Sequence, residues 1–259
     1  MKRIRLRWVF LLALVFIYLP VLVLMIYSFN DSRFAMNWQG FTLKWYGILF
    51  SSPETALALK NTLIVSITAT IVSTVLGTLF AIGMHLYPFP GKRFIEPLFL
   101  LPIIIPDIIM AIALLAFYVF VQLSLGHLSI IIAHITFQIS FIAFVVKSRM
   151  QDFPKNILEA AQDLGANQWH VFTKIIFPLV RPGIVAGALI AFTLSVDDFL
   201  ITYFTAGAGS STLPIRIYSM VKRGVTPDVN ALSTMILLVT LVLLYLGIRL
   251  QRTESRRSG

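Results

Sequence analysis

The chain has 259 residues, of which 58% are hydrophobic and 12% are charged, and its mean hydropathy is +0.88. A water-soluble domain carries about twice that charged fraction, so the composition excludes an ordinary soluble fold and indicates one membrane domain. The chain has no cysteine and only four histidines. Disulfides, thiol chemistry and cysteine-ligated metals are therefore excluded, and we expect no metal site.

Six apolar segments are long enough to cross about 30 Å of hydrocarbon as helices. They cover residues 8–29, 61–85, 97–121, 128–150, 180–205 and 230–250. The first follows a basic run that resembles the start of a signal peptide. It is too long for a cleaved signal and no small-residue cleavage site follows it, so we interpret it as a retained span. The pattern predicts an all-α integral membrane protein with six transmembrane helices.

Two of these segments carry small residues at helical spacing. They are Gly183 with Gly187 in the fifth segment, and the series Ser73, Gly77 and Ala81 in the second. Small side chains allow two helix backbones to approach closely inside a membrane. We interpret both series as packing faces with no ligand role.

Basic residues predict how the chain is oriented. If the N-terminus is cytoplasmic, fifteen of the 21 Lys and Arg residues lie inside and six lie outside. This excess favours both termini in the cytoplasm. A net charge of +10 also suits nucleic-acid binding. Here the basic residues flank apolar runs, where they contact anionic lipid, so we expect no nucleic-acid partner.

The cytoplasmic segment 152–178 predicts two short helices on the inner face of the membrane. Asp152 can cap the first helix, with Pro154 in its first turn. Gly165 suits the left-handed residue that ends it, and Asn167 can cap a second helix that runs to about Ile176. A DNA-binding helix–turn–helix is a poor alternative, because two spans tether the unit and its second helix is apolar. A passive amphipathic surface helix is the other alternative.

The same segment contains Glu159-Ala160-Ala161, then Gly165 after three residues, and Ile175 through Pro178 after nine more. This spacing resembles the EAA motif of permease subunits of ABC importers, with Phe177 in place of the usual leucine. In that family the loop docks into a groove of the ATPase subunit and transmits its closure. The resemblance implies that Glu159, Ala160, Ala161 and Gly165 couple this chain to an ATPase.

The chain has no Gly-x-x-x-x-Gly-Lys-[Ser/Thr] phosphate loop. We also find no plausible nucleophile, base and metal arrangement, so we expect a transport subunit and not an enzyme. The chain itself should bind no cofactor. ATP and Mg²⁺ are expected in the partner ATPase.

Three acids fall inside predicted spans: Asp107, Asp197 and Asp198. Each costs about 2.5–3.5 kcal/mol at the centre of a membrane helix, and no basic residue lies at similar depth in these spans. They should face a wet cavity, a partner or a cation. We expect Asp107 and at least one of the pair to line a path for a cation, to which Tyr203 could add a cation–π contact. The sequence does not distinguish Asp197 from Asp198.

Two external segments, 30–60 and 206–229, are candidate docking surfaces for a soluble partner. Trp38 and Trp45 lie in the first, and Arg216 and Lys222 lie in a predicted short helix of the second. Aromatic residues at these positions also serve as membrane-interface anchors, which is the simpler interpretation.

Many stretches resemble the permease subunits of spermidine/putrescine importers, of the PotC type. Examples are Lys44-Trp45-Tyr46, Pro106-Asp107-Ile108, the sequence around Asp197-Asp198, and Leu213-Pro214. The resemblance covers nearly the whole chain and implies a type I ABC importer permease (MetI-like) fold with a cytoplasmic coupling helix. It also implies a place in the inner membrane of a bacterial cell. The implied partners are a PotB-like second permease, two PotA-like ATPase subunits, a PotD-like periplasmic binding protein and a polyamine substrate.

Two other classes of transporter remain open. One is an ABC permease for another small solute, although unpaired intramembrane acids argue against an anion. The other is an ion-coupled secondary transporter whose buried acids relay protons, against which the EAA spacing argues.

Overall fold

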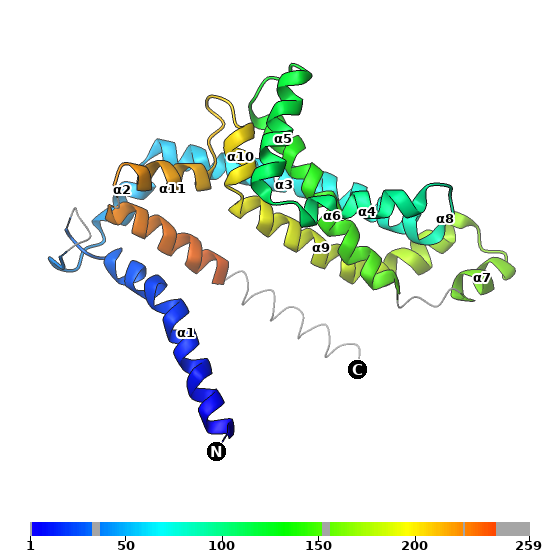
Figure 1. Ribbon diagram of the computed structural model, residues 1–259, viewed down its shortest axis with the longest axis horizontal. Coiled ribbons are helices and arrows are strands. Elements are labelled where there is room, and N and C mark those ends of the chain that lie inside the picture. Colours follow the sequence, from blue (N-terminus) through cyan, green and yellow to red (C-terminus); the bar gives the residue numbers. More distant parts are fainter. Residues whose placement is uncertain (1, 33–36, 152–155, 225, 242–259) are drawn as a thin grey trace. The chain divides into compact units, whose positions relative to one another are not determined.

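The computed structural model describes residues 2–32, 37–151, 156–224 and 226–241, and these are mostly helical (Figure 1). Its contacts divide the chain into two compact units, Leu57–Ile215 and the two flanking parts of the chain. The helices are α1 Lys2–Tyr27, α2 Lys44–Phe50, α3 Pro53–Leu86, α4 Lys92–Ile104, α5 Asp107–Phe120, α6 His127–Gln151, α7 Asn156–Asp163, α8 Gln168–Val171, the π-helix η1 Phe172–Ile176, α9 Phe177–Asp197, α10 Leu200–Thr205, α11 Leu213–Lys222 and a last helix Pro227–Leu241.

Within the described residues, four stretches of helix are long and apolar enough to span a membrane: Arg7–Tyr27, Pro53–Leu86, His127–Gln151 and Gln168–Asp197. The bent pair α4 and α5 supplies a fifth apolar stretch. The helix Pro227–Leu241 is shorter, and the rest of the predicted span 230–250 lies outside the described residues. The multi-span, all-α fold is therefore confirmed, while the count of six spans stays a prediction.

The predicted span 97–121 is not one straight helix. α4 ends at Ile104, α5 begins at Asp107, and the two axes meet at 109°. Pro106 has no amide hydrogen to continue the α4 ladder. Ile105 before it is extended, with ψ of 134°, as the residue preceding a proline prefers. The bend places Asp107 at the first position of a new helix.

The predicted span 180–205 is also divided. α9 ends at Asp197 and α10 begins at Leu200, with an extended Asp198 (ψ 124°) between them. No proline lies at this break, so its cause is a side-chain contact described below. At its other end, α9 continues from α8 through η1, so Pro178 sits in a first helical turn and does not end the preceding helix.

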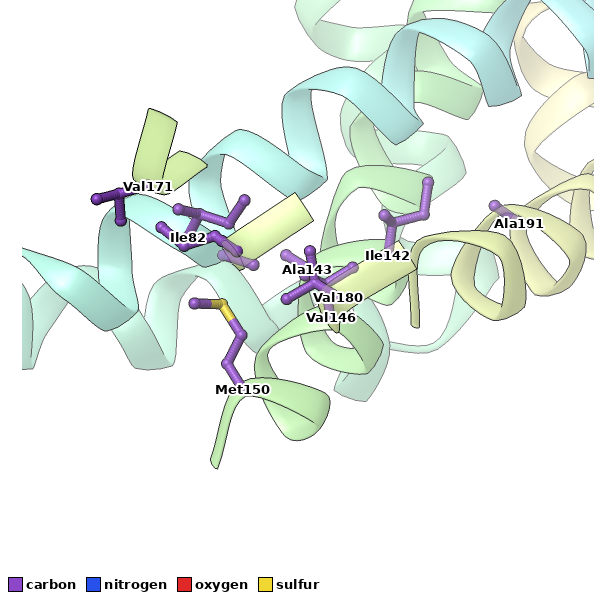
Figure 2. Packing of buried hydrophobic residues seen from close by; sticks show 10 residues of the cluster. Ile82, Ile142, Ala143, Val146, Met150, Val171, Val180 and Ala191 are labelled. Atoms are coloured by element: carbon purple, nitrogen blue, oxygen red, sulfur yellow. The ribbon is translucent and has the colours of Figure 1, made fainter. Parts of the chain in front are cut away.

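The centre of the Leu57–Ile215 unit is the packing of α6 against α9. A cluster of buried side chains joins these two helices to α3, and Figure 2 shows Ile142, Val146 and Val180 at its middle. The predicted packing faces lie here. A Cβ on Gly187 would approach the Ile142 Cα to 3.3 Å, and one on Gly77 would approach the Ile139 carbonyl oxygen to 2.9 Å. These positions require glycine because the backbone of another helix lies against them.

The segment 152–178, which the sequence places in the cytoplasm, has the predicted corner. Gly165 has φ of +80°, and α8 begins after Asn167, whose side chain accepts a hydrogen bond from the His170 amide at 2.8 Å. The predicted cap Asp152 lies outside the described residues.

Candidate functional site

Asp107 and Asp197 line the same cavity, although they lie far apart in the sequence. Its volume is about 350 Å³, and both carboxylates are exposed. The described lining consists of Pro102, Asp107, Met110, Phe137, Phe141, Thr193, Leu194, Asp197, Asp198, Phe199, Leu200 and Ile201. This lining holds three acids and no Lys, Arg or His, so it favours a cation.

The bend between α4 and α5 provides one wall of the cavity. Pro102 lies in the lining, and its carbonyl has no helical donor four residues on because that residue is Pro106. Asp107 occupies the first turn of α5, where the partial positive charge of the helix N-terminus stabilises a carboxylate. The residues of this wall therefore include a carboxylate and one carbonyl without a helical donor, a combination that suits an ammonium group.

Asp198 has a different environment from its neighbour. Its Oδ2 atom accepts hydrogen bonds from the Thr202 amide and the Thr202 hydroxyl, both at 2.7 Å, and its Oδ1 atom lies 3.4 Å from the Ile201 amide. A carboxylate that accepts from the first free amides of a helix is an N-terminal cap. Asp198 lies one residue before Phe199, which occupies the N-cap position of α10, and its carboxylate caps the helix in place of the Phe199 side chain. This capping explains the break after α9.

His134 holds the same carboxylate from the neighbouring helix α6. Its Nε2 atom lies 2.9 Å from the Thr202 hydroxyl oxygen and 3.3 Å from Asp198 Oδ2, and its Nδ1 atom lies 2.6 Å from the Ser195 hydroxyl oxygen. The ring of His134 is 1% exposed. Sequence reasoning missed this residue, because a lone histidine in an apolar segment gives no sign of its partners.

Tyr203 lies outside the described lining of the cavity, which contains Phe199 instead. The two rings are tilted by 38° with their centroids 5.3 Å apart, and Tyr203 is 49% exposed. The aromatic residues of the described lining are thus Phe137, Phe141 and Phe199.

The predicted coupling residues lie on α7 and at the corner that follows it. Ala160 is exposed, while Ala161 is half-buried and packs against the cluster that contains Val171 and Val180. The backbone of Glu159 is helical, and its side chain lies outside the described set. Leu164 and Trp169 flank the corner as large exposed apolar side chains, which the sequence analysis did not single out.

Two of the four external docking candidates are occupied within the chain. The Trp45 indole is buried and donates to the Asn30 carbonyl at 2.8 Å, and Arg216 pairs with Glu54 at 2.5 Å. Trp38 is half-exposed and packs edge-on against Tyr27. Lys222 is exposed at the end of α11.

A family model described as "binding-protein-dependent transport system inner membrane component" matches residues 73–258. The spermidine/putrescine transport system permease protein PotC of Escherichia coli K12 is 39% identical over 93% of this chain and 91% of its own length. The putrescine transport system permease protein PotI of the same strain is 36% identical over 96% of this chain and 92% of its own length.

One solved structure supports the fold alone. A chain of a bacterial ABC transporter that imports the acidic polysaccharide alginate superposes with a TM-score of 0.74 at 18% identity, over 97% of this chain and 96% of that one. The family match, the PotC-type relatives and the multi-span fold agree. The chain belongs to the family of binding-protein-dependent transport system inner membrane components, the permease subunits of ABC importers.

Proposed function

We propose that this permease forms half of the path of an ATP-driven polyamine importer, and that the cation passes through the cavity lined by Asp107 and Asp197. The relatives' names supply the substrate class, since PotC and PotI are named for spermidine and putrescine transport. The observation that carries the proposal is the joint presence of these two exposed acids in one cavity whose described lining has no basic residue.

The cavity suits transient contact with a diamine or longer polyamine. Exposed carboxylates attract an ammonium group without the cost of a fully buried ion pair. Pro102 adds a carbonyl acceptor, and Phe137, Phe141 and Phe199 provide apolar surface for the methylene chain between ammonium groups. Contacts of this strength allow entry and release, which a tight site near the membrane midplane would slow.

Coupling to ATP follows from the position of α9. This helix follows the corner at Gly165 through α8 and η1 and ends at Asp197, and its 21 residues cover roughly 30 Å along one axis. Ala161 packs on the cluster to which Val171 and Val180 also belong. A displacement of the loop around Glu159, Ala160, Ala161 and Gly165 would therefore move one wall of the cavity.

The assembly that this coupling requires is part of the proposal. A PotB-like permease would complete the path, and two PotA-like subunits would bind ATP and Mg²⁺ against the EAA loop. A PotD-like binding protein would deliver the polyamine at the external face, with Trp38 and Lys222 as the more accessible contacts. Both termini would lie in the cytoplasm, by the distribution of basic residues.

The test is polyamine uptake by the complete complex in proteoliposomes that contain ATP. We expect Asp107→Asn and Asp197→Asn each to lower the initial rate of spermidine uptake about tenfold, which corresponds to about 1.4 kcal/mol. Binding-protein-stimulated ATP hydrolysis should persist and show that the complex assembles.

Thr193→Val is the matched control, because Thr193 lines the same cavity without a charge. Its uptake should stay close to that of the unmodified complex. Normal uptake by the Asp107 and Asp197 variants would refute the acidic path. A loss in the Thr193 variant equal to theirs would show that the effect does not depend on charge.

A further inference from the structure

The adjacent acids Asp197 and Asp198 have separate environments at the break after α9. Asp197 is exposed in the cavity, whereas the Asp198 side chain is 9% exposed and is bonded to α10 and to α6. A polar group buried in this way must find partners or it destabilises the fold. Among the residues that the structure describes, Asp198 bonds to Thr202, Ile201 and His134.

The positions of the protons in this cluster follow from its donors and acceptors. Asp198 as a carboxylate only accepts, so the single hydroxyl proton of Thr202 points at it. The Thr202 oxygen must then accept from His134, which places a proton on Nε2. The Nδ1 atom on the other side of the ring lies 2.6 Å from the Ser195 hydroxyl oxygen, so both ring nitrogens have a hydrogen-bond partner.

These bonds tie three segments together at one point. His134 lies on α6, Ser195 lies in the last turn of α9, and Thr202 lies on α10. Asp198 is the extended residue between α9 and α10, and Asp197 directly precedes it as the last residue of α9. The direction in which the Asp197 side chain points therefore depends on the bonds that fix the backbone at this break.

We infer that His134 is a positioning residue: by fixing Asp198 as the cap of α10, it sets the break after α9 so that Asp197 faces the cavity. Asp198 is then a structural partner of His134 and not itself a cation contact. This inference rests on the proposed path, since it concerns how one of its two acids is aimed.

Two substitutions distinguish the bonds made by Nε2 of His134 from the bond made by its Nδ1. His134→Gln keeps a donor that can reach Thr202 and Asp198. His134→Asn is shorter, and it keeps a partner for Ser195 while losing the reach to Asp198. Both retain a polar group in the buried position, which limits damage to the fold.

Gln138 supplies the matched control. It lies one turn further along α6, is fully buried, and donates to the Ala191 carbonyl of α9 at 3.2 Å, away from the bonds that hold Asp198. Gln138→Met removes a different bond between the same two helices. It therefore reports what a loss of general packing does to transport.

The experiment is a double-mutant cycle with Asp197→Asn, measured as KM and maximal rate of spermidine uptake by the complete complex. His134→Asn should lower uptake about tenfold alone, and less than about twofold further when Asp197 is already Asn, because contacts that act as a unit are not additive. His134→Gln should stay within about threefold of the unmodified complex. Gln138→Met should cause the same fold-loss in both backgrounds.

A second measurement reads the direction of position 197 directly. The chain has no cysteine, so Asp197→Cys introduces a single thiol that a cationic methanethiosulfonate reagent can modify. His134→Asn should slow this modification, while His134→Gln should not. This readout does not require transport.

Three results would overturn the inference. One is an equal fold-loss for His134→Asn in both Asp197 backgrounds, which would make His134 a packing residue like Gln138. Another is unchanged thiol modification in His134→Asn. The last is normal uptake by Asp197→Asn alone, which would refute the proposed path together with the inference, whereas the first two leave the path intact.

Discussion

Lys147 and Glu96 form an ion pair that joins α6 to α4. Both side chains line a second cavity of about 230 Å³, in which Phe80 of α3 also stacks on Phe99 of α4. α4 leads directly into the bend at Pro106, and α6 carries His134. The pair therefore ties together two of the helices that support the acidic cavity.

The first prediction concerns this pair. Both side chains are partly exposed, so removing one charge with Glu96→Gln should lower the stability of the complex by no more than about 1 kcal/mol. The reversal Glu96→Lys should cost more, because it places two like charges together. Adding Lys147→Glu should restore the loss. Thermal melting of the purified complex measures all three, and a swap that fails to recover would rule out a direct pairing.

The second prediction compares two glycines of α3. At Gly77 an added Cβ would lie 2.9 Å from the Ile139 carbonyl oxygen, whereas at Gly83 it would meet nothing within 4 Å. Gly77→Ala should destabilise the complex by about 1–3 kcal/mol, because the neighbouring backbone must shift. Gly83→Ala should be neutral or stabilising by up to about 1 kcal/mol, because alanine favours a helix. Equal melting temperatures would contradict the packing of α3 against α6.

The third prediction tests the coupling loop. Glu159→Lys reverses the charge of the EAA motif and should reduce binding-protein-stimulated ATP hydrolysis and uptake together. Asp163→Lys makes the same charge change at the exposed end of the same helix, outside the motif, and should have a smaller effect. If Glu159→Lys retained full stimulation, the assignment of this loop as the contact with the ATPase would be wrong.

Local features of the fold could be predicted from the sequence. Apolar runs located the long helices, and the spacing of Gly183 and Gly187 located a packing face that the structure confirms. Gly165 and Asn167 have local roles, in backbone conformation and capping, so their residue types alone identified the corner.

The features that the sequence missed depend on contacts between distant segments. The break at Asp198 arises because its carboxylate caps α10 and is also held by His134. His134 lies on α6, far from Asp198 in the sequence. Hydropathy predicted 180–205 as one span because the segment is predominantly apolar. The sequence also could not distinguish Asp197 from Asp198, because their roles differ only through their partners. Trp45 was a candidate docking residue for the same reason, and its indole is instead bonded to Asn30.

The central claim is that the cavity of Asp107 and Asp197 belongs to a path for polyamines driven by ATP. The most direct measurement is the uptake of radiolabelled putrescine and spermidine by the complete complex in proteoliposomes. We predict uptake that requires ATP and the binding protein, survives collapse of the proton gradient, and falls when both acids are replaced by asparagine. Uptake that persists without ATP hydrolysis but stops with the proton gradient, or that is unchanged in the double variant, would contradict this account.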